Sequence, residues 1–146
     1  MLHGKYAVTI LRPATVVFDH IADGTRNAAW RGPVIEVAVL AGDGREGTVW
    51  HQMLRGSGGR VAEADYRVTV FERPQTFGFE LIAGPVRGDG AYTLVELVAG
   101  ETTLTLALNL RPSGILPGLT GLARRQMATE LDALDRLRNL LSSRTR

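Results

Sequence analysis

A chain of 146 residues, 45% of them hydrophobic and 22% charged, has the size and composition of one ordinary globular domain. The formal charge of +2 is too small to indicate that the protein binds a phosphate backbone, so we expect no nucleic-acid partner. The absence of cysteine excludes disulfides, thiolate zinc sites and cysteine nucleophiles. Because no segment has the apolar run of a signal peptide or a membrane span, the sequence predicts a cytoplasmic location without integral membrane contact.

The first predicted elements are a strand and a short helix. Residues Tyr6–Leu11 are rich in Val, Ile and Thr and end at Arg12-Pro13, which predicts a strand stopped by proline. From Ala14 onward, apolar residues recur at spacings of three and four until Asp23-Gly24. This spacing predicts one short amphipathic helix.

Apolar and polar residues alternate along most of the chain from Gly32-Pro33 to Leu110, and glycine or proline turns interrupt the alternation. The pattern predicts six more strands. They are expected at Ile35–Leu40, Thr48–Arg55, Arg60–Phe71, Thr76–Ala83, Gly88–Val98 and Thr102–Arg111.

The last segment changes to a helical period. Between Leu119 and Leu141, apolar residues fall at steps of three, four and one, which is typical of an amphipathic helix. At about 1.5 Å per residue such a helix extends for about 35 Å, enough to cross a small sheet. Because no repeat or linker interrupts this order, we expect residues 1–146 to form a single domain.

These elements predict an α+β fold in which a seven-stranded antiparallel sheet curves around the C-terminal helix, with a short helical segment after strand 1. Alternation assigns to the inner face Ile35, Val37 and Val39; Trp50, Gln52 and Leu54; Tyr66, Val68 and Val70; Phe77, Phe79 and Leu81; Tyr92 and Leu94; and Leu104, Leu106, Leu108 and Leu110. Residues of the opposite parity, which we expect in water, include Glu63, Asp65, Arg67, Glu80 and Asn109. Periodicity alone leaves open whether the space between sheet and helix is a cavity or a filled core.

Several short motifs in this order are familiar. They are Arg12-Pro13-Ala14, Val17-Phe18, Ile21-Ala22-Asp23, Trp30, Gly47-Thr48-Val49-Trp50, Tyr66-Arg67-Val68-Thr69, Glu72-Arg73-Pro74, Gly84-Pro85-Val86 and Gly100-Glu101-Thr102-Thr103. With them, nearly the whole chain resembles the START-like helix-grip superfamily (SRPBCC), particularly its polyketide cyclase/dehydrase-like branch. The resemblance implies a helix-grip fold with a hydrophobic tunnel for lipids, polyketides or other small apolar molecules. Members of this fold include carriers, cyclases, hydrolases and chaperone-stimulating modules, so the fold leaves the activity open.

Candidate ligand-binding residues share an expected position on the inner face of the sheet, at its rim or on the inner side of the last helix. They are Trp30, Trp50, Gln52, Tyr66, Val68, Phe77, Phe79, Tyr92, Leu106, Leu108, Met127 and Leu131. Trp30 would either stack on a flat ligand or pack as a hinge, and Gln52 would either orient a ligand carbonyl or hydroxyl or bond to Tyr66 or backbone. Tyr66 and Tyr92 would donate hydrogen bonds, act as general acids, or simply pack.

The remaining titratable residues give no catalytic or metal site. His51 has the wrong parity for the pocket unless a bulge shifts its strand, so a surface role is expected. His3 and His20 are too isolated to suggest a metal triad, and no cofactor is predicted. The favoured function is therefore binding of a small hydrophobic molecule, with a cyclase-like enzyme and a chaperone-stimulating module as alternatives. Ligand identity, turnover and oligomeric state stay open.

Overall fold

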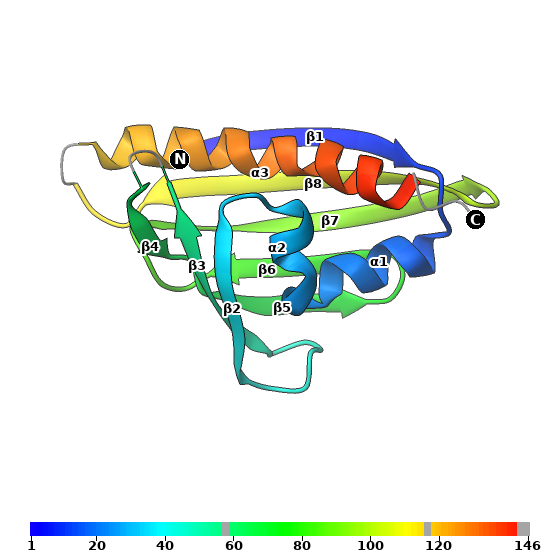
Figure 1. Ribbon diagram of the computed structural model, residues 1–146, viewed down its shortest axis with the longest axis horizontal. Coiled ribbons are helices and arrows are strands. Elements are labelled where there is room, and N and C mark those ends of the chain that lie inside the picture. Colours follow the sequence, from blue (N-terminus) through cyan, green and yellow to red (C-terminus); the bar gives the residue numbers. More distant parts are fainter. Residues whose placement is uncertain (57–58, 116–117, 143–146) are drawn as a thin grey trace.

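The computed structural model describes residues 1–56, 59–115 and 118–142, and its main feature is one curved antiparallel sheet that carries its helices on one side (Figure 1). The strands are β1 (Leu2–Ile10), β2 (Val34–Ala41), β3 (Val49–Arg55), β4 (Val61–Glu63), β5 (Tyr66–Glu72), β6 (Thr76–Leu81), β7 (Val86–Val98) and β8 (Glu101–Pro112). The helical segments are α1 (Ala14–Ala22), η1 (Gly24–Arg26), α2 (Asn27–Trp30) and α3 (Leu119–Ser142).

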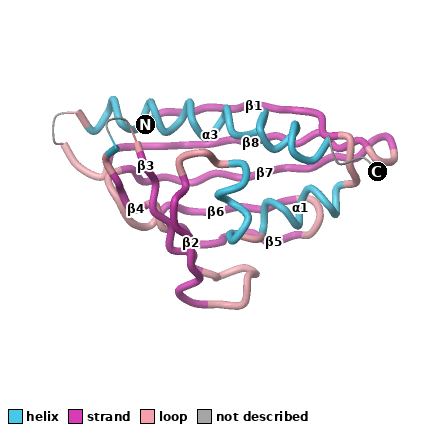
Figure 2. Tube along the Cα trace, in the orientation of Figure 1, coloured by secondary structure: helices cyan, strands magenta, loops and turns pink. Residues whose placement is uncertain are grey.

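The sheet order is β1-β8-β7-β6-β5-β3-β2, and β4 pairs with β3. Every pairing is antiparallel. The predicted helix-grip fold is confirmed, including the short helix after the first strand and the long C-terminal helix (Figures 1 and 2). No helix in the described parts of the chain combines the length and apolar character needed to span a membrane.

The expected strand at Arg60–Phe71 is instead two strands, so the described residues form eight strands rather than seven. The interruption arises because β3 changes partner along its length: Trp50 pairs with Tyr66 of β5, whereas Leu54 pairs with Ala62 of β4. Between these two pairings the chain shifts position, and the nitrogen of Ala64 donates a hydrogen bond to the carbonyl of Gln52 at 2.8 Å.

The edge strand β2 departs from the predicted alternation. Ile35 and Val39 were expected to face inward, but they are 45% and 50% exposed, whereas Val34 is buried. Ile35 lies within an irregularity of the pairing with β3, between Val34 and Glu36, and strict alternation therefore gives the wrong face at this position. Val39 is the cross-strand partner of Trp50 and shares its face, as predicted, but it is exposed because it lines an open hollow.

Helix α3 lies along β1 and β8 and presents Ala123, Leu134, Leu137 and Leu141 to the core. The helix approaches β1 closely at Gly4, where a Cβ would overlap the Sδ of Met127 and come within 3.1 Å of a Leu131 methyl. The missing side chain at Gly4 therefore sets the distance between the helix and the sheet edge.

Helix α1 obtains its N-terminal cap from a distant strand. Pro13 precedes the helix and contributes no side-chain cap. Glu96 of β7 replaces it: one carboxylate oxygen accepts a hydrogen bond from the nitrogen of Ala14 and the other from the nitrogen of Gly100, each at 2.8 Å. These two bonds hold the pKa of Glu96 below its ordinary value. A carboxylate in this position also interacts favourably with the helix dipole.

We expect Glu96→Ala to lower the melting temperature by a few degrees, because the first turn of α1 loses its acceptor. The folded-state pKa lies below the ordinary value of 4.5, so the stabilisation is present above that pH and is lost as the pH falls through the folded pKa. Thermal unfolding of wild type, Glu96→Ala and the exposed control Glu101→Ala between pH 7 and pH 3 measures this effect. Equal shifts in both variants, or a shift independent of pH, would contradict the assignment.

Candidate functional site

Asn27, Gln52 and Tyr66 form a hydrogen-bonded group inside the sheet. Asn27 begins α2, whereas Gln52 and Tyr66 come from β3 and β5. The amide of Asn27 donates to Gln52 Oε1 at 3.2 Å and to the Tyr66 hydroxyl at 3.0 Å. None of the three residues is more than 3% exposed. The group therefore fixes α2 on the inner face of the sheet and gives the buried amide of Gln52 a partner.

A buried ion pair joins Arg31, which follows α2, to Glu130 in the middle of α3. Two guanidinium nitrogens of Arg31 donate to Glu130 Oε1 at 3.0 and 2.6 Å, and the two side chains are only 9% and 8% exposed. Burial opposes the charged form of Arg31, but the attraction of Glu130 outweighs it and holds the pKa of Arg31 above its ordinary value. Arg31 also lies 5.5 Å from the centroid of the Trp30 ring, within the range of a cation–π contact.

Four polar atoms in the interior have no hydrogen-bond partner among the described residues. They are Asn27 Oδ1, Trp30 Nε1, Trp50 Nε1 and the Tyr92 hydroxyl. The great majority of buried polar groups in proteins are paired with protein or water, so four unpaired atoms within one interior need an explanation. A bound molecule that offers complementary polar groups would supply one.

A series of neighbouring aromatic rings joins Trp30 to Tyr66 through Tyr92 and Phe79. The Tyr92 ring lies 6.3 Å from Trp30 and 5.8 Å from Phe79 between centroids, and Tyr66 lies 6.1 Å from Phe79. Burial raises the pKa of Tyr92 and that of Tyr66. Both hydroxyls therefore stay protonated at neutral pH, as hydrogen-bond donors rather than bases.

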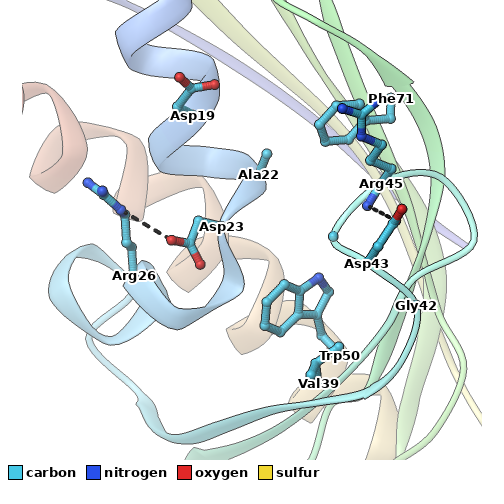
Figure 3. Close-up of a pocket in the computed structure, with 11 residues that line it drawn as sticks. Asp19, Ala22, Asp23, Arg26, Val39, Gly42, Asp43, Arg45, Trp50 and Phe71 are labelled. Carbon is cyan, nitrogen blue, oxygen red and sulfur yellow. Dashed lines mark hydrogen bonds and ion pairs between the residues drawn. The ribbon is translucent and has the colours of Figure 1, made fainter.

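A hollow of about 630 Å³ opens between α1 and the turn that joins β2 to β3 (Figure 3). Its apolar lining includes Ala22, Val39, Trp50 and Phe71, and its charged lining includes Asp19, Asp23, Arg26, Asp43 and Arg45. Trp50 lines this hollow and also borders the interior, since it pairs across the sheet with the buried residue Tyr66. A volume of this size is typical of small-molecule sites.

A second hollow of about 370 Å³ lies over β5 to β8, beside Glu80, Asp89 and Asn109. Neither hollow lies between the sheet and α3, where the sequence analysis expects a cavity. That cavity stays a prediction.

The structure brings most of the candidate ligand-binding residues together on the inner face. Those that are buried there are Trp30, Trp50, Gln52, Tyr66, Val68, Phe77, Phe79, Tyr92, Leu106 and Leu108. Met127 and Leu131 are only partly buried; they pack against the same core cluster and lie beside Gly4 of β1. A role for any of them in ligand binding stays a prediction.

Sequence analysis missed the polar half of the interior: Asn27, Arg31 and Glu130. One signal was available, because Glu130 falls three residues after Met127 and four before Leu134, on the apolar side of the helix. Asn27 and Arg31 belong to the short segment η1–α2, which has no usable periodicity.

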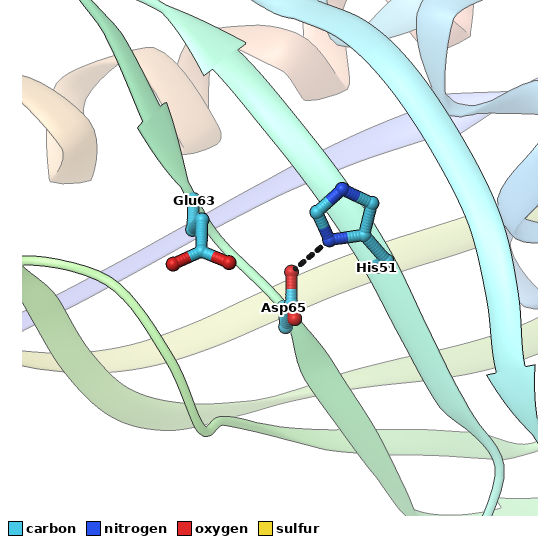
Figure 4. A group of neighbouring side chains, drawn as sticks. All are labelled: His51, Glu63 and Asp65. Carbon is cyan, nitrogen blue, oxygen red and sulfur yellow. Dashed lines mark hydrogen bonds and ion pairs between the residues drawn. The ribbon is translucent and has the colours of Figure 1, made fainter.

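On the opposite face of β3, His51 and Asp65 lie against each other (Figure 4). The prediction that Asp65 lies in water is wrong, since this residue is only 7% exposed. Its Oδ1 is 2.8 Å from His51 Nδ1 and accepts a hydrogen bond from the nitrogen of Gln52 at 3.2 Å. Asp65 lies between β4 and β5, and alternation does not extend across that break. The side chain of His51 is 21% exposed.

Comparison with known proteins gives both a family match and close structural neighbours. The model of the family described as polyketide cyclase/dehydrase and lipid transport matches residues 1–141. No curated protein matches the sequence.

Three of the solved structures with similar folds illustrate the likeness. A START superfamily protein from Mycobacterium smegmatis has a TM-score of 0.79 and 17% identity, covering 98% of this chain and 99% of that one. The Zhui aromatase/cyclase from Streptomyces sp. R1128 has a TM-score of 0.78 and 18% identity, covering 99% and 96%. The di-domain ARO/CYC BexL from the BE-7585A biosynthetic pathway has a TM-score of 0.73 and 17% identity over 95% of this chain. This chain spans about half of the di-domain protein, 46% of its length.

We expect Arg31→Met and Glu130→Met each to destabilise the fold by about 3–5 kcal/mol, because each leaves a buried charge without its partner. The double variant Arg31→Met/Glu130→Met should lose much less than the sum of the two. Urea unfolding of the single and double variants measures the free energies. Arg67→Ala is the matched control, since it breaks an ion pair with Glu80 that is about half exposed, and should change stability by less than about 1 kcal/mol. Additive losses would show that the two charges are not coupled.

Proposed function

Because the chain belongs to the polyketide cyclase/dehydrase and lipid transport family, we propose that it binds a small, mainly apolar molecule with a few polar groups on the inner face of its sheet. In this proposal residues 1–146 act as one ligand-binding domain in the cytoplasm. The resemblance to the START-like helix-grip superfamily, seen in the sequence, is confirmed by the family match and by the fold.

The observation that supports the proposal is the set of four polar atoms in the interior that have no hydrogen-bond partner among the described residues. Trp30 Nε1 and Trp50 Nε1 can only donate, the Tyr92 hydroxyl can donate or accept, and Asn27 Oδ1 can only accept. A ligand that satisfies them carries carbonyl or ether oxygens and at least one hydroxyl. Such a pattern fits an oxygenated ring system better than a plain hydrocarbon.

The open hollow supports a route to this interior. It is large enough for a small organic molecule, and Trp50 lies at the boundary between hollow and interior. We propose that the ligand approaches between α1 and the β2–β3 turn and that Trp50 contacts it first.

The chemistry of the interior favours binding over turnover. Tyr66 and Tyr92 have raised pKa values and remain neutral donors, and Glu130 is held by Arg31. Such groups can polarise a carbonyl, but a base for proton abstraction would have to be released from the ion pair. Cyclisation of a reactive chain by shape and hydrogen bonds alone is the second candidate, favoured by the likeness to an aromatase/cyclase.

Native mass spectrometry of the protein purified from its own host distinguishes these candidates. A carrier should retain a compound and release it unchanged, whereas a cyclase should convert the isolated compound on incubation. A protein that retains nothing from its host and binds no oxygenated aromatic compound would contradict both candidates and leave an interaction module.

A defined probe pair tests the polar interior directly. Wild type should bind 2-naphthol more tightly than naphthalene, because only naphthol offers an oxygen to the buried donors. Tyr92→Phe should weaken naphthol binding about fivefold and leave naphthalene binding unchanged, the loss of roughly one hydrogen bond. Isothermal titration calorimetry measures both affinities.

Tyr6→Phe is the matched control, since the Tyr6 hydroxyl bonds to Asp135 at an exposed position on β1. Equal affinities for naphthol in the wild type and Tyr92→Phe would remove the Tyr92 hydroxyl from the site.

A further inference from the structure

A second group of polar side chains lies on the face of β3 that points away from the interior. His51, Glu63 and Asp65 each offer one atom to a set whose members all lie within 4.8 Å of one another (Figure 4). His51 comes from β3, Glu63 from β4, and Asp65 from the link to β5. On the other side of the imidazole, Glu36 Oε2 of β2 lies 3.3 Å from His51 Nε2.

We propose that His51, Glu63 and Asp65 form a binding site for a divalent d-block cation of the zinc type, with Glu36 orienting the imidazole. This site is independent of the proposed ligand-binding function, because it lies on the opposite face of the strand from the Gln52 side chain. Its failure would leave that function untouched.

The hydrogen-bond inventory of His51 is the first argument. A neutral imidazole has one N–H, yet both ring nitrogens of His51 face carboxylate oxygens, at 2.8 Å and 3.3 Å. One nitrogen would therefore direct a lone pair at an oxygen lone pair unless a proton or a cation lies between them. With a cation bound at Nδ1, the Nε2 hydrogen donates to Glu36, and this carboxylate–histidine–metal arrangement is common in zinc sites.

Charge is the second argument. Three carboxylates surround one imidazole, so the group keeps an excess of negative charge even when His51 is protonated. A divalent cation would neutralise this excess more completely than one proton does.

Placement on the sheet is the third argument. His51 is held within β3, and Asp65 is fixed by a hydrogen bond from the nitrogen of Gln52 to its side chain and by one from Ile82 to its carbonyl. The side chains of His51 and Asp65 would therefore lose little conformational freedom when they bind a cation, while the exposed side chain of Glu63 can adjust its position. One imidazole with two carboxylates suits zinc and its neighbours, whereas Mg²⁺ and Ca²⁺ prefer oxygen alone.

Calorimetric titration of the untagged full chain with ZnCl₂ tests the site. Wild type should bind one Zn²⁺ per chain, and MgCl₂ should not replace it. His51→Gln should weaken zinc binding at least tenfold, and Glu36→Gln by about tenfold through the outer contact. His20→Gln, which changes a histidine on α1 outside the group, is the matched control and should bind zinc as wild type does.

Glu63→Gln guards against a trivial loss of fold, because Glu63 is exposed and its substitution should spare the structure while weakening zinc binding. Zinc should also raise the melting temperature of wild type and not that of His51→Gln, since a cation that binds only the folded state stabilises it. Equal zinc affinity in wild type and His51→Gln, no measurable binding in wild type, or equal affinity for Mg²⁺ would each overturn the proposal.

Discussion

The buried ion pair between Arg31 and Glu130 is the contact on which the arrangement of the interior depends. It joins the segment after α2 to the middle of α3, so it fixes the distance between these two helical segments on the same side of the sheet. Charges in an apolar interior are tolerated only when they are paired and hydrogen-bonded. Any movement of α3 away from the sheet must therefore break this pair or carry α2 along. The sheet and its helix are held by a specific polar contact as well as by apolar burial.

Strand β3 connects the two polar groups of the protein. Trp50 and Gln52 point into the interior, and His51 between them points to the outer face with Asp65. Asp65 also accepts a hydrogen bond from the backbone of Gln52, so one carboxylate touches both groups. The interruption between β4 and β5 is what allows this, because it frees Asp65 from the sheet ladder and turns it toward β3. An irregular piece of backbone thus carries the side chain that links the two groups.

The helical spacing of apolar residues and the alternation of apolar and polar residues in strands were enough to predict the fold where the chain is regular. Strands β6 to β8 bury Phe77, Phe79, Tyr92, Leu106 and Leu108 as alternation requires, because each strand lies between two partners and register fixes the face. The same reasoning failed for Ile35 of β2 because this residue lies in an irregularity of an edge strand, where the pairing does not enforce the face. Sequence reasoning therefore predicts the buried face of a strand well when the strand is paired with a neighbouring strand on each side.

The polar interior could be predicted only in part. Gln52 and the two tyrosines were expected to face inward from strand parity, but their partners could not be found in the same way. Arg31 and Asn27 lie in a segment with no period, and contacts across 99 and 25 residues depend on how the helices pack. Glu130 was detectable in principle, as a carboxylate at an apolar position of an amphipathic helix. A polar residue on a predicted apolar face is therefore a useful pointer to a buried site.

The distribution of donors and acceptors narrows the chemistry of any occupant. A saturated hydrocarbon in this interior would leave the polar groups of Trp30, Trp50 and Tyr92 unpaired, as they already are, and would bind through apolar burial alone. An oxygenated ligand would add a hydrogen bond to each group that it reaches, worth about 0.5–1.5 kcal/mol. In an oxygenated ring system, carbonyl and ether oxygens would accept from the indoles while a hydroxyl would donate to Asn27. Under the proposed function, the interior would therefore favour oxygenated molecules over the most apolar ones, although apolar side chains make up most of its wall.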